Sequence, residues 1–293
     1  MRALEVLEPG AFALVQDLGR PGYAHLGVPP SGALDLGALR LANRLAGNPD
    51  SAAGIESMLG GLSVRATASC TAAVTGPPVG VRVDGRDVGS HAPLPLRAGQ
   101  TLTIGVPASG LRCYLAVSGG IAAPAALGSR SRDVLSGIGP EPLARGTILP
   151  LGDAVGIPSG ADVVAPCVPP PELVVPLTLG PRDDWLADPA ALSTWWTVTA
   201  ESNRVGLRLD GPALRRAPAY AEAELPSEGV VTGAVQVPPS GLPVIFLSDH
   251  PTTGGYPVVA VVRRSALDAL AQARPGTRLR LRPTGGTDFR PGG

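Results

Sequence analysis

Glycine and proline make up about a quarter of this chain, with 39 glycines and 33 prolines among 293 residues. So high a content favours turns and interrupts helices, and it approaches the level at which a chain can be disordered. Two observations argue against disorder: no short repeat occurs, and the mean hydropathy is positive at +0.20, whereas disordered chains are polar or highly charged. The sequence therefore predicts a mainly β fold of many short strands, with only a few short helices.

The charged residues exclude several classes of function. The chain has 24 basic and 24 acidic residues, so it lacks the basic field that holds nucleic acid or an anionic membrane. Every basic residue is arginine, for which genomic base composition is a sufficient cause. The absence of lysine nevertheless excludes a Schiff-base lysine, a Walker A lysine and a lysine that carries biotin. We expect no nucleic-acid partner, no membrane partner and no covalent biotin.

The cysteines and the N-terminus predict a cytoplasmic location. Cys70, Cys113 and Cys167 are far apart and form no CxxC pair, which is typical of reduced, buried thiols. The first ten residues include Glu5 and Glu8 and contain no apolar run, so we expect no signal peptide. No apolar run in the sequence is long enough to predict a membrane span.

Several segments have the pattern of β-strands. Val81–Val83 and Val88 flank Asp84-Gly85, a pair that accepts positive φ and therefore predicts a tight hairpin. Residues 278–282 alternate arginine and leucine, as a half-buried strand does. Apolar runs of strand length occur at 173–179 and 258–262. A turn glycine followed by a strand recurs at Gly99, Gly146 and Gly276.

Two helices are predicted. Asp35 is suited to cap a helix over 36–46, where apolar residues recur on one face and a glycine follows the last turn. Ser265 is suited to start a second helix over 266–273, which a Pro-Gly pair ends.

A repeated pentapeptide and a proline-rich segment predict two domains. The sequence VPPSG occurs at 28–32 and again at 237–241, which suggests two halves built alike. The segment 166–171 has four prolines in six residues and is the best linker candidate. The repeat also permits a discontinuous arrangement in which the N-terminal strand joins the second half. We expect a first domain over 1–168, a second over 169–283 and a flexible tail over 284–293.

Familiar catalytic motifs do not occur. The sequence has no GxSxG elbow, no HExxH and no GxGxxG that opens a helix. His25, His91 and His250 are far apart, and none has the spacing of a metal ligand. We therefore predict no metal site on this chain, although acidic residues distant in sequence could still assemble one.

The segment Gln16–Gly22 follows an apolar stretch and presents an amide, a carboxylate and a guanidinium in close succession. Arg20 could clamp a carboxylate or phosphate through two parallel hydrogen bonds. Alternatively, Asp17 and Arg20 pair with each other and staple a loop. The sequence does not decide between these interpretations.

A second polar segment, Ser118–Gly120, ends the predicted strand 112–117. Paired glycines let N–H groups point at an anion, but a tight bend is the simpler interpretation. Nearby, Arg130 adds a guanidinium that is more typical of a surface or interface residue than of a ligand.

Three further polar segments lie in the second half, at 201–208, at 227–233 with Gln236 beyond it, and at 249–256. For 201–208, a glycine at 206 favours a loop followed by a strand. The segment 249–256 has two threonines, two glycines and a tyrosine, as expected of a loop that wraps a small polar molecule or of a decorated hairpin. His250 could carry a proton, but a single histidine is more often structural.

These segments together resemble one family closely. The matches are QDLGRPGYAHLGVPPSGALD (16–35), LRLANRLAGNP (39–49), LAVSGGIAAPAALGSRSRD (115–133), GPRDDW (180–185), SNRVGLRLDG (202–211), SEGVVTGAVQVPPSGLPV (227–244) and TTGGYPVVA (252–260). They identify the chain as similar to a family of carboxyltransferase-type proteins called allophanate hydrolase subunit 2, KipA or the 5-oxoprolinase C subunit. One stretch departs from the usual family pattern, at Glu201, Val205 and Leu207.

The resemblance implies two cyclophilin-like β-barrel subdomains. It also implies a KipI-like B subunit and a LamB/YcsF-like A subunit as partners, and ATP-dependent opening of 5-oxoproline to glutamate. ATP, with Mg²⁺, would bind in the complex. Biotin-dependent carboxyl transfer to urea or a similar amide is an alternative, and a non-catalytic regulator that binds a KipI-like protein is another.

On this basis we predict catalytic roles for Arg20, Asp17 and His250. We predict substrate or ATP binding by Gln16, Gly19, Gly22, Ser31, Ser118, Gly119, Gly120, Arg204, Glu228, Gln236, Thr252, Thr253, Gly254, Gly255 and Tyr256.

Overall fold

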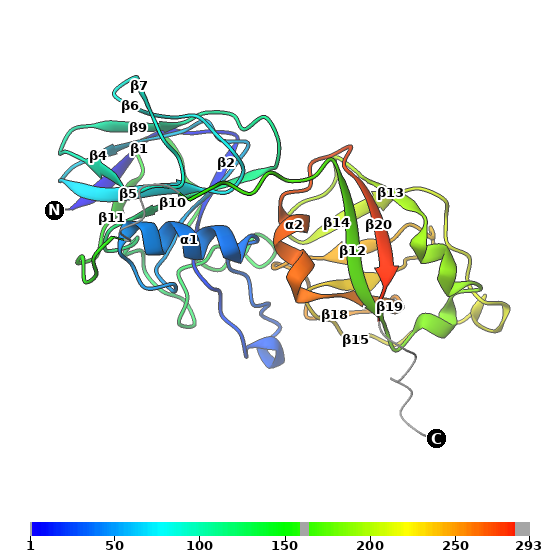
Figure 1. Cartoon of the computed structure of the whole chain (residues 1–293). Coiled ribbons are helices and arrows are strands. Elements are labelled where there is room, and N and C mark those ends of the chain that lie inside the picture. The colour runs from blue at the N-terminus through cyan, green and yellow to red at the C-terminus, as the bar shows by residue number, and fades with distance from the viewer. Residues whose placement is uncertain (1, 159–163, 285–293) are drawn as a thin grey trace. The chain divides into compact units, whose positions relative to one another are not determined.

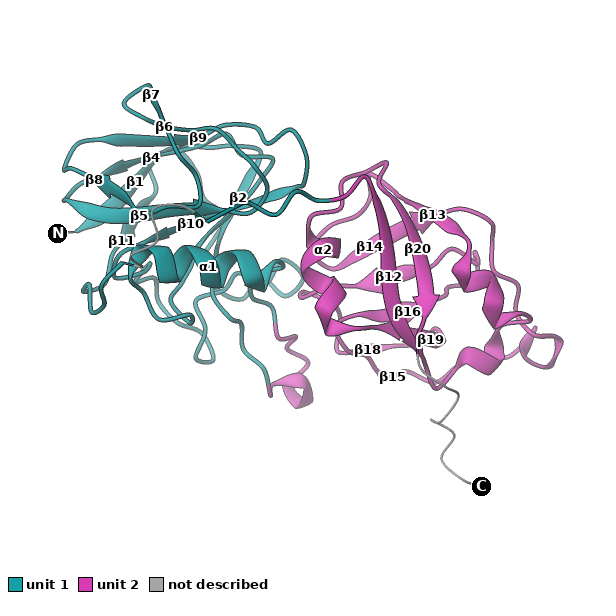
Figure 2. Ribbon diagram, viewed as in Figure 1, with its two compact units in different colours: residues 1–21, 31–169 teal, residues 22–30, 170–293 magenta. Residues whose placement is uncertain are grey.

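The computed structural model describes residues 2–158 and 164–284. They form two compact units, one made of the described residues within 1–21 and 31–169 and the other of those within 22–30 and 170–293 (Figure 2). The second unit is thus discontinuous. The chain passes between the units at Pro169–Pro170, inside the proline-rich segment, while β1 (Ala3–Pro9) pairs with strands of the first unit.

The first unit contains two antiparallel sheets (Figure 1). The six-stranded sheet has the order β11 (Ile148–Pro150), β1 (Ala3–Pro9), β4 (Leu62–Ala66), β9 (Thr101–Ile104), β6 (Val81–Val83), β7 (Arg86–Val88). The five-stranded sheet has the order β2 (Phe12–Gln16), β3 (Gly54–Met58), β10 (Arg112–Val117), β5 (Cys70–Thr75), β8 (Leu94–Leu96). One apolar core takes side chains from both sheets, among them Leu4 and Val64 of the first and Val15, Ile55 and Leu115 of the second.

Helix α1 (Leu36–Ala46) packs on the other face of the five-stranded sheet, where Leu39 and Leu45 join Tyr114 and Ala116 in a second apolar cluster. Strand β10 is therefore buried on both faces, because its alternate residues enter the two clusters. Asp35 accepts a 2.8 Å hydrogen bond from Ala38 N, so the predicted helix and its cap are confirmed.

The second unit is built on a closed seven-stranded barrel. Its strands follow the order β12 (Glu172–Leu179), β19 (Val258–Val262), β16 (Ala234–Gln236), β17 (Val244–Phe246), β14 (Gly206–Asp210), β13 (Trp195–Val198), β20 (Arg278–Pro283). A parallel pairing of β20 with β12 closes the barrel. A separate two-stranded sheet pairs β15 (Glu228–Gly229) with β18 (Thr253–Gly254).

Short helical turns complete the described chain. These are η1 (Ala24–Leu26), η2 (Asp183–Trp185), η3 (Pro189–Ser193), η4 (Pro218–Tyr220), η5 (Arg264–Ala266) and the short helix α2 (Leu267–Ala271). None of the helices within residues 2–158 and 164–284 combines the length and the apolar character needed to cross a bilayer. The mainly β fold with few short helices, predicted from sequence, is confirmed.

The hairpin predicted from two adjacent residues is confirmed. Asp84 and Gly85 have φ of 49° and 79° and join β6 to β7, as the hairpin pattern predicts. The helix predicted over 266–273 is wrong in extent: only Leu267–Ala271 is α-helical, because Ser265 lies inside the 3-10 turn η5 and provides no cap.

Two other expectations concern the thiols and the C-terminal tail. Cys113 is buried, but Cys167 is exposed, so the prediction of three buried thiols is wrong. Cys167 lies in the described stretch 164–170, which has no regular secondary structure to enclose it. Of the predicted tail, only Thr284 belongs to the described residues, and 285–293 lie outside them.

Candidate functional site

The carboxylate of Asp17 is the centre of a buried polar cluster in the first unit. Its Oδ1 accepts hydrogen bonds from the hydroxyls of Ser129 and Ser131, at 2.5 and 2.6 Å, and from Gly19 N at 2.8 Å. Its Oδ2 accepts from Arg130 N at 2.6 Å. Asp17 follows β2 directly, so this one carboxylate ties the end of that strand to a segment more than a hundred residues later.

Arg20 is 1% exposed and reinforces the same junction. Its Nε donates to the carbonyl of Ala126 at 3.2 Å, and its Nη2 donates to the carbonyl of Ser131. These contacts with backbone carbonyls fit the interpretation in which Arg20 staples a loop. The catalytic roles of Asp17 and Arg20, including a clamp on a ligand's carboxylate or phosphate, stay predictions.

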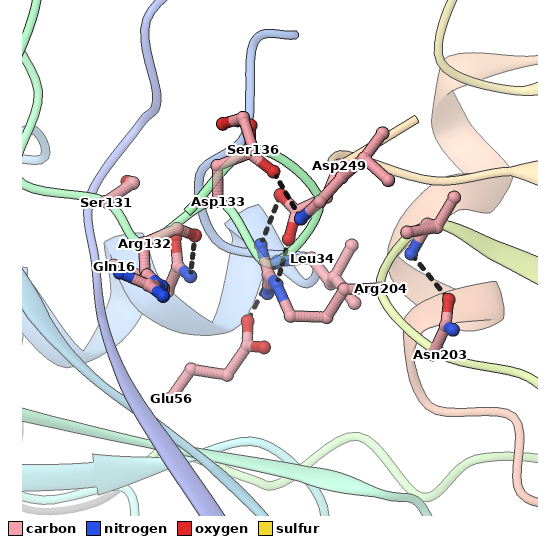
Figure 3. A network of polar contacts seen from close by, with 12 residues as sticks. Gln16, Leu34, Glu56, Ser131, Arg132, Asp133, Ser136, Asn203, Arg204 and Asp249 are labelled. Atoms are coloured by element: carbon pink, nitrogen blue, oxygen red, sulfur yellow. Dashed lines mark hydrogen bonds and ion pairs between the residues drawn. The ribbon is translucent and has the colours of Figure 1, made fainter. Parts of the chain in front are cut away.

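Gln16 ends β2 with a fully buried side chain. Its Nε2 donates to the carbonyl of Arg132 at 2.9 Å (Figure 3). Its Oε1 has no hydrogen-bond partner among the described residues, and the same holds for the buried Nε of Arg132. The predicted binding residue thus presents an unused acceptor inside the first unit.

Ser31 has another buried oxygen without a partner in the described parts of the chain, and its φ of 53° is rare for a residue with a side chain. The next residue, Gly32, packs on Gly19: a Cβ there would lie 2.9 Å from Gly19 N. The structure therefore packs Gly32, the neighbour of Ser31, against Gly19, and the carbonyl of Asp17 accepts from Ala33 N. Gly22 has open space around it and belongs to the other unit.

The segment Ser118–Gly120 forms a tight bend. The N–H groups of its three residues donate to Thr71 O, Asn48 Oδ1 and Val117 O, at 2.7, 2.8 and 2.8 Å. A Cβ at Gly119 would lie 2.0 Å from Gly152 O, so glycine is required by close backbone packing. With these N–H groups engaged inside the unit, the contacts do not support the predicted cradle for a phosphate.

A second buried cluster was missed by the sequence analysis. Glu56 Oε2 accepts from Leu34 N at 3.0 Å and from the Tyr114 hydroxyl at 2.8 Å, while its Oε1 lies 3.5 Å from Arg112 Nε. The Tyr114 hydroxyl in turn accepts from Asp35 N at 2.8 Å. Burial, followed by the nearby charges of Glu56 and Asp35, raises the pKa of Tyr114 well above 10.

One signal could have revealed this cluster. Arg112 and Tyr114 are two residues apart in an otherwise apolar strand, so they occupy one face of it. Polar side chains on a face that is otherwise apolar imply a buried partner.

In the second unit, Arg204 and Asp249 form a bidentate ion pair, with Nε–Oδ2 at 2.8 Å and Nη2–Oδ1 at 3.2 Å (Figure 3). The side chains are 4% and 0% exposed. Strand β14 begins two residues after Arg204, so the predicted loop followed by a strand is confirmed. The pairing itself was not foreseen, because 45 residues separate the partners.

His250 is next to this pair in the chain and is 3% exposed. Its Nδ1 lies 2.7 Å from the carbonyl of Pro251, and its ring centroid lies 6.0 Å from that of Phe246. These contacts fit a structural histidine, and catalysis by His250 stays a prediction.

The remaining candidates meet at the small β15–β18 sheet. Pairing of Glu228 with Gly254 brings the segments 227–236 and 252–256 together. Gln236 Nε2 donates to the carbonyl of Tyr256 at 3.0 Å, and a Cβ at Gly254 would lie 2.6 Å from that nitrogen. The rest of the predicted loop contacts the same segment. Val230 N donates to Thr252 O, Thr253 pairs with Gly229, and Gly255 lies near Ser227. Tyr256 is 46% exposed.

Glu228 is held by Arg182 through a two-point ion pair, with Nε–Oε2 at 3.2 Å and a closer contact between Nη2 and Oε1. The hydrogen bond from Arg182 lowers the pKa of Glu228. Glu228 is therefore an anchor of the small sheet, a role that the sequence analysis did not assign.

The described residues contain no group of three or more His, Cys, Asp or Glu side chains that could hold a metal ion. The glycine segment 118–120 has no N–H groups to offer a phosphate. Where ATP and Mg²⁺ bind in the complex stays a prediction.

A family model for the carboxyltransferase domain, subdomains A and B, matches residues 26–283. The chain belongs to this family. Within the carboxyltransferase-domain family it is 37% identical to the 5-oxoprolinase C subunit of Escherichia coli K12, over 92% of this chain and 87% of that protein. The resemblance inferred from the sequence motifs is confirmed.

Larger members of the carboxyltransferase-domain family are also similar. Urea amidolyase of Saccharomyces cerevisiae is 33% identical over 96% of this chain, which corresponds to 16% of that protein. The crystal structure of the K. lactis urea amidolyase superposes with a TM-score of 0.89 at 29% identity, over 97% of this chain and 19% of that one. The chain thus spans under a fifth of the length of these urea amidolyases.

Proposed function

We propose that this chain is the C subunit of an ATP-dependent 5-oxoprolinase that converts 5-oxoproline to glutamate. The observation that carries the proposal is its 37% identity to a 5-oxoprolinase C subunit along 87% of that protein. The proposed partners are a KipI-like B subunit and a LamB/YcsF-like A subunit, and the proposed location is the cytoplasm.

The proposed division of labour follows from the polar groups of this chain. A five-membered lactam is a poor electrophile with a poor leaving group, so its hydrolysis needs activation by ATP. The bend at Ser118–Gly120 has no N–H groups for a phosphate, and the described residues offer no metal cluster. We therefore assign ATP and Mg²⁺ to a partner protein, and binding of the lactam to the polar clusters of this chain.

Carboxyl transfer to urea or a similar amide is the second candidate. It is supported by the 33% identity to a urea amidolyase and by the TM-score of 0.89 to a solved one. Without a lysine, this chain could not carry biotin itself, so a separate carrier protein would be required.

The test is 5-oxoproline-dependent ATP hydrolysis, with glutamate followed in parallel. The chain is assayed alone, with the KipI-like candidate and with both partner candidates, and the two partner candidates are also assayed without it. Release of ADP and glutamate by the full set, and not by sets that omit this chain, supports the proposal. Transfer of carboxylate from a biotinylated carrier to urea, without any turnover of 5-oxoproline, would replace it with the second candidate.

A further inference from the structure

The second unit contains a pocket that none of the predicted site residues lines. It has a volume of about 340 Å³ and lies between residues 187–194, which include η3, and residues 212–215, which follow β14. Its lining is mostly apolar, with Ala191, Pro212 and Leu214 among it, and the polar lining residues are Asp188, Thr194 and Arg215. A mostly apolar pocket with a few polar groups is typical of small-molecule sites, which measure about 300–1,000 Å³.

The two walls of this pocket are fixed by backbone contacts. Ala187 N donates to Arg215 O at 2.9 Å and joins one wall to the other. The second copy of the repeated pentapeptide, at 237–241, supports the wall 212–215. Leu214 N donates to Gly241 O at 2.9 Å, and a Cβ at Gly241 would lie 2.5 Å from Leu214 O. The walls therefore hold their shape without a ligand.

Asp188 and Arg215 give the pocket two opposite charges that do not pair with each other. No guanidinium nitrogen of Arg215 lies within 4.0 Å of a carboxylate oxygen of Asp188. Asp188 Oδ1 accepts from Ala190 N at 2.9 Å, while its Oδ2 accepts from no group in the described residues. The Arg215 side chain makes no hydrogen bond or ion pair within residues 2–158 and 164–284. Both residues are exposed, so a ligand can reach them from solvent.

These groups define the chemistry of a matching ligand. The planar guanidinium of Arg215 can hold a carboxylate through two hydrogen bonds, and Asp188 Oδ2 can accept from an ammonium group. An anion without a positive charge would face the Asp188 carboxylate in the same pocket, and a cation without a negative charge would face Arg215. The apolar lining calls for an aliphatic body between the two ends. A free α-amino acid with an aliphatic side chain offers all three parts.

We propose that this pocket binds a free aliphatic α-amino acid, with Arg215 holding its carboxylate and Asp188 its ammonium group. The proposal does not rest on the function proposed above, because the pocket lies within the second unit and uses none of the residues predicted for that reaction. Glutamate fits less well, since its second carboxylate would lie against the apolar lining. 5-Oxoproline fits less well because it has no ammonium group.

The probe is L-leucine, and its dissociation constant is measured by calorimetry on the full chain. N-acetyl-L-leucine lacks the ammonium group, and L-leucinamide lacks the carboxylate. Each analogue is expected to bind about tenfold more weakly than L-leucine, because one charged end of the pocket is left without a partner. L-Glutamate and 5-oxoproline should also bind more weakly than L-leucine.

Two variants assign the charged ends. Arg215→Met keeps the apolar stem and removes the guanidinium, so it should weaken the binding of L-leucine about tenfold. Asp188→Asn keeps an oxygen for Ala190 N and removes the charge, so it should weaken L-leucine but not N-acetyl-L-leucine. Arg208→Met is the matched control, because Arg208 is an exposed arginine of β14 in the same unit and does not line the pocket. It should leave the affinity unchanged.

The absence of L-leucine binding by wild type would overturn the proposal, as would binding that Arg215→Met leaves unchanged. Equal affinity for L-leucine and N-acetyl-L-leucine would show that the pocket accepts an anion and not a zwitterion. Tighter binding of 5-oxoproline than of L-leucine, lost in Arg215→Met, would make the pocket a substrate site and refute the proposal as well. None of these results changes the outcome of the assay of 5-oxoproline turnover, so the two proposals fail separately.

Discussion

Arg204 and Asp249 form a two-point ion pair that is almost completely removed from solvent, with side chains 4% and 0% exposed. The backbone repeats the connection, because Asp249 N donates to Arg204 O at 3.2 Å and Leu247 N donates to Val205 O at 2.9 Å. The loop before β14 and the loop after β17 are thus joined twice.

Breaking this pair from one side should be costly. Asp249→Asn deprives the buried Arg204 guanidinium of the Asp249 charge, and we expect a loss of about 3–5 kcal/mol in the free energy of unfolding. The double variant Arg204→Met, Asp249→Leu removes both charges and should lose less than the single variant. Chemical denaturation of the three proteins tests this order. A double variant less stable than Asp249→Asn would contradict it.

The pair of Glu228 with Arg182 should give a small, pH-dependent stabilisation. Arg182 lowers the pKa of Glu228 below its ordinary value near 4.5. The stabilisation is therefore complete above pH 4.5 and is lost as the pH falls through the lower pKa of the folded state. Because both side chains are about one-third exposed, we expect it to be worth at most about 1 kcal/mol.

Denaturation of wild type and Glu228→Gln across pH 3 to 7 measures this effect. The difference between them should be present at pH 7 and shrink at the acid end. In an Arg182→Met background, the same substitution should make almost no difference at any pH. A difference that persists at low pH in wild type would assign the effect to packing instead of charge.

Elements whose conformation depends on residues close together in the sequence could be predicted from it. The hairpin at Asp84-Gly85 depends on the φ that two adjacent residues adopt, and helix 36–46 depends on a cap and a periodic face within one segment. The second helix failed because its first turn is 3-10, and the sequence near Ser265 does not distinguish a 3-10 turn from an α-helical one.

The polar clusters depend on long-range register, which a single sequence does not contain. Glu56 meets Tyr114 because β3 and β10 pair in one particular register, and a shift of one residue would turn Glu56 toward the apolar core. Similarly, Asp17 meets Ser129 and Ser131 only through the folded path of the chain. The sequence singled out the segment around Asp17 as either functional or structural. It did not show which distant residues contact Asp17.

Because the bend at Ser118–Gly120 is tightly packed, one methyl group added at Gly119 should strongly lower the free energy of unfolding. In Gly119→Ala the new Cβ would lie 2.0 Å from Gly152 O, at a φ of 93°. Gly99→Ala is the control, since Gly99 has a similar φ of 85° and open space around it. We expect about 1 kcal/mol of destabilisation for Gly99→Ala and a clearly larger value for Gly119→Ala. Equal losses would show that backbone conformation alone requires glycine at 119.

Tyr114 should remain neutral far into the alkaline range. Burial and the charges of Glu56 and Asp35 raise its pKa well above 10, so its hydroxyl keeps donating to Glu56. An absorbance titration of the folded protein should therefore be the same for wild type and Tyr114→Phe. The variant should lose about 1–3 kcal/mol, because Asp35 N and Glu56 each lose a buried partner. A titration step missing from the variant would place the Tyr114 hydroxyl in contact with solvent.

Arg20→Lys separates the two interpretations of Arg20. A lysine cannot reproduce the planar fork that donates to the carbonyls of Ala126 and Ser131, so a staple predicts a lower free energy of unfolding, by about 1–3 kcal/mol. As a staple, the variant should keep its KM for 5-oxoproline and for ATP once activity is corrected for the folded fraction. A clamp on a carboxylate or phosphate predicts the opposite, with the KM of one ligand raised about tenfold and little change in stability. Arg86→Lys, on the exposed hairpin, is the control and should change neither quantity. The contacts of Arg20 favour the first outcome, and a rise in one KM without a loss of stability would restore its catalytic role.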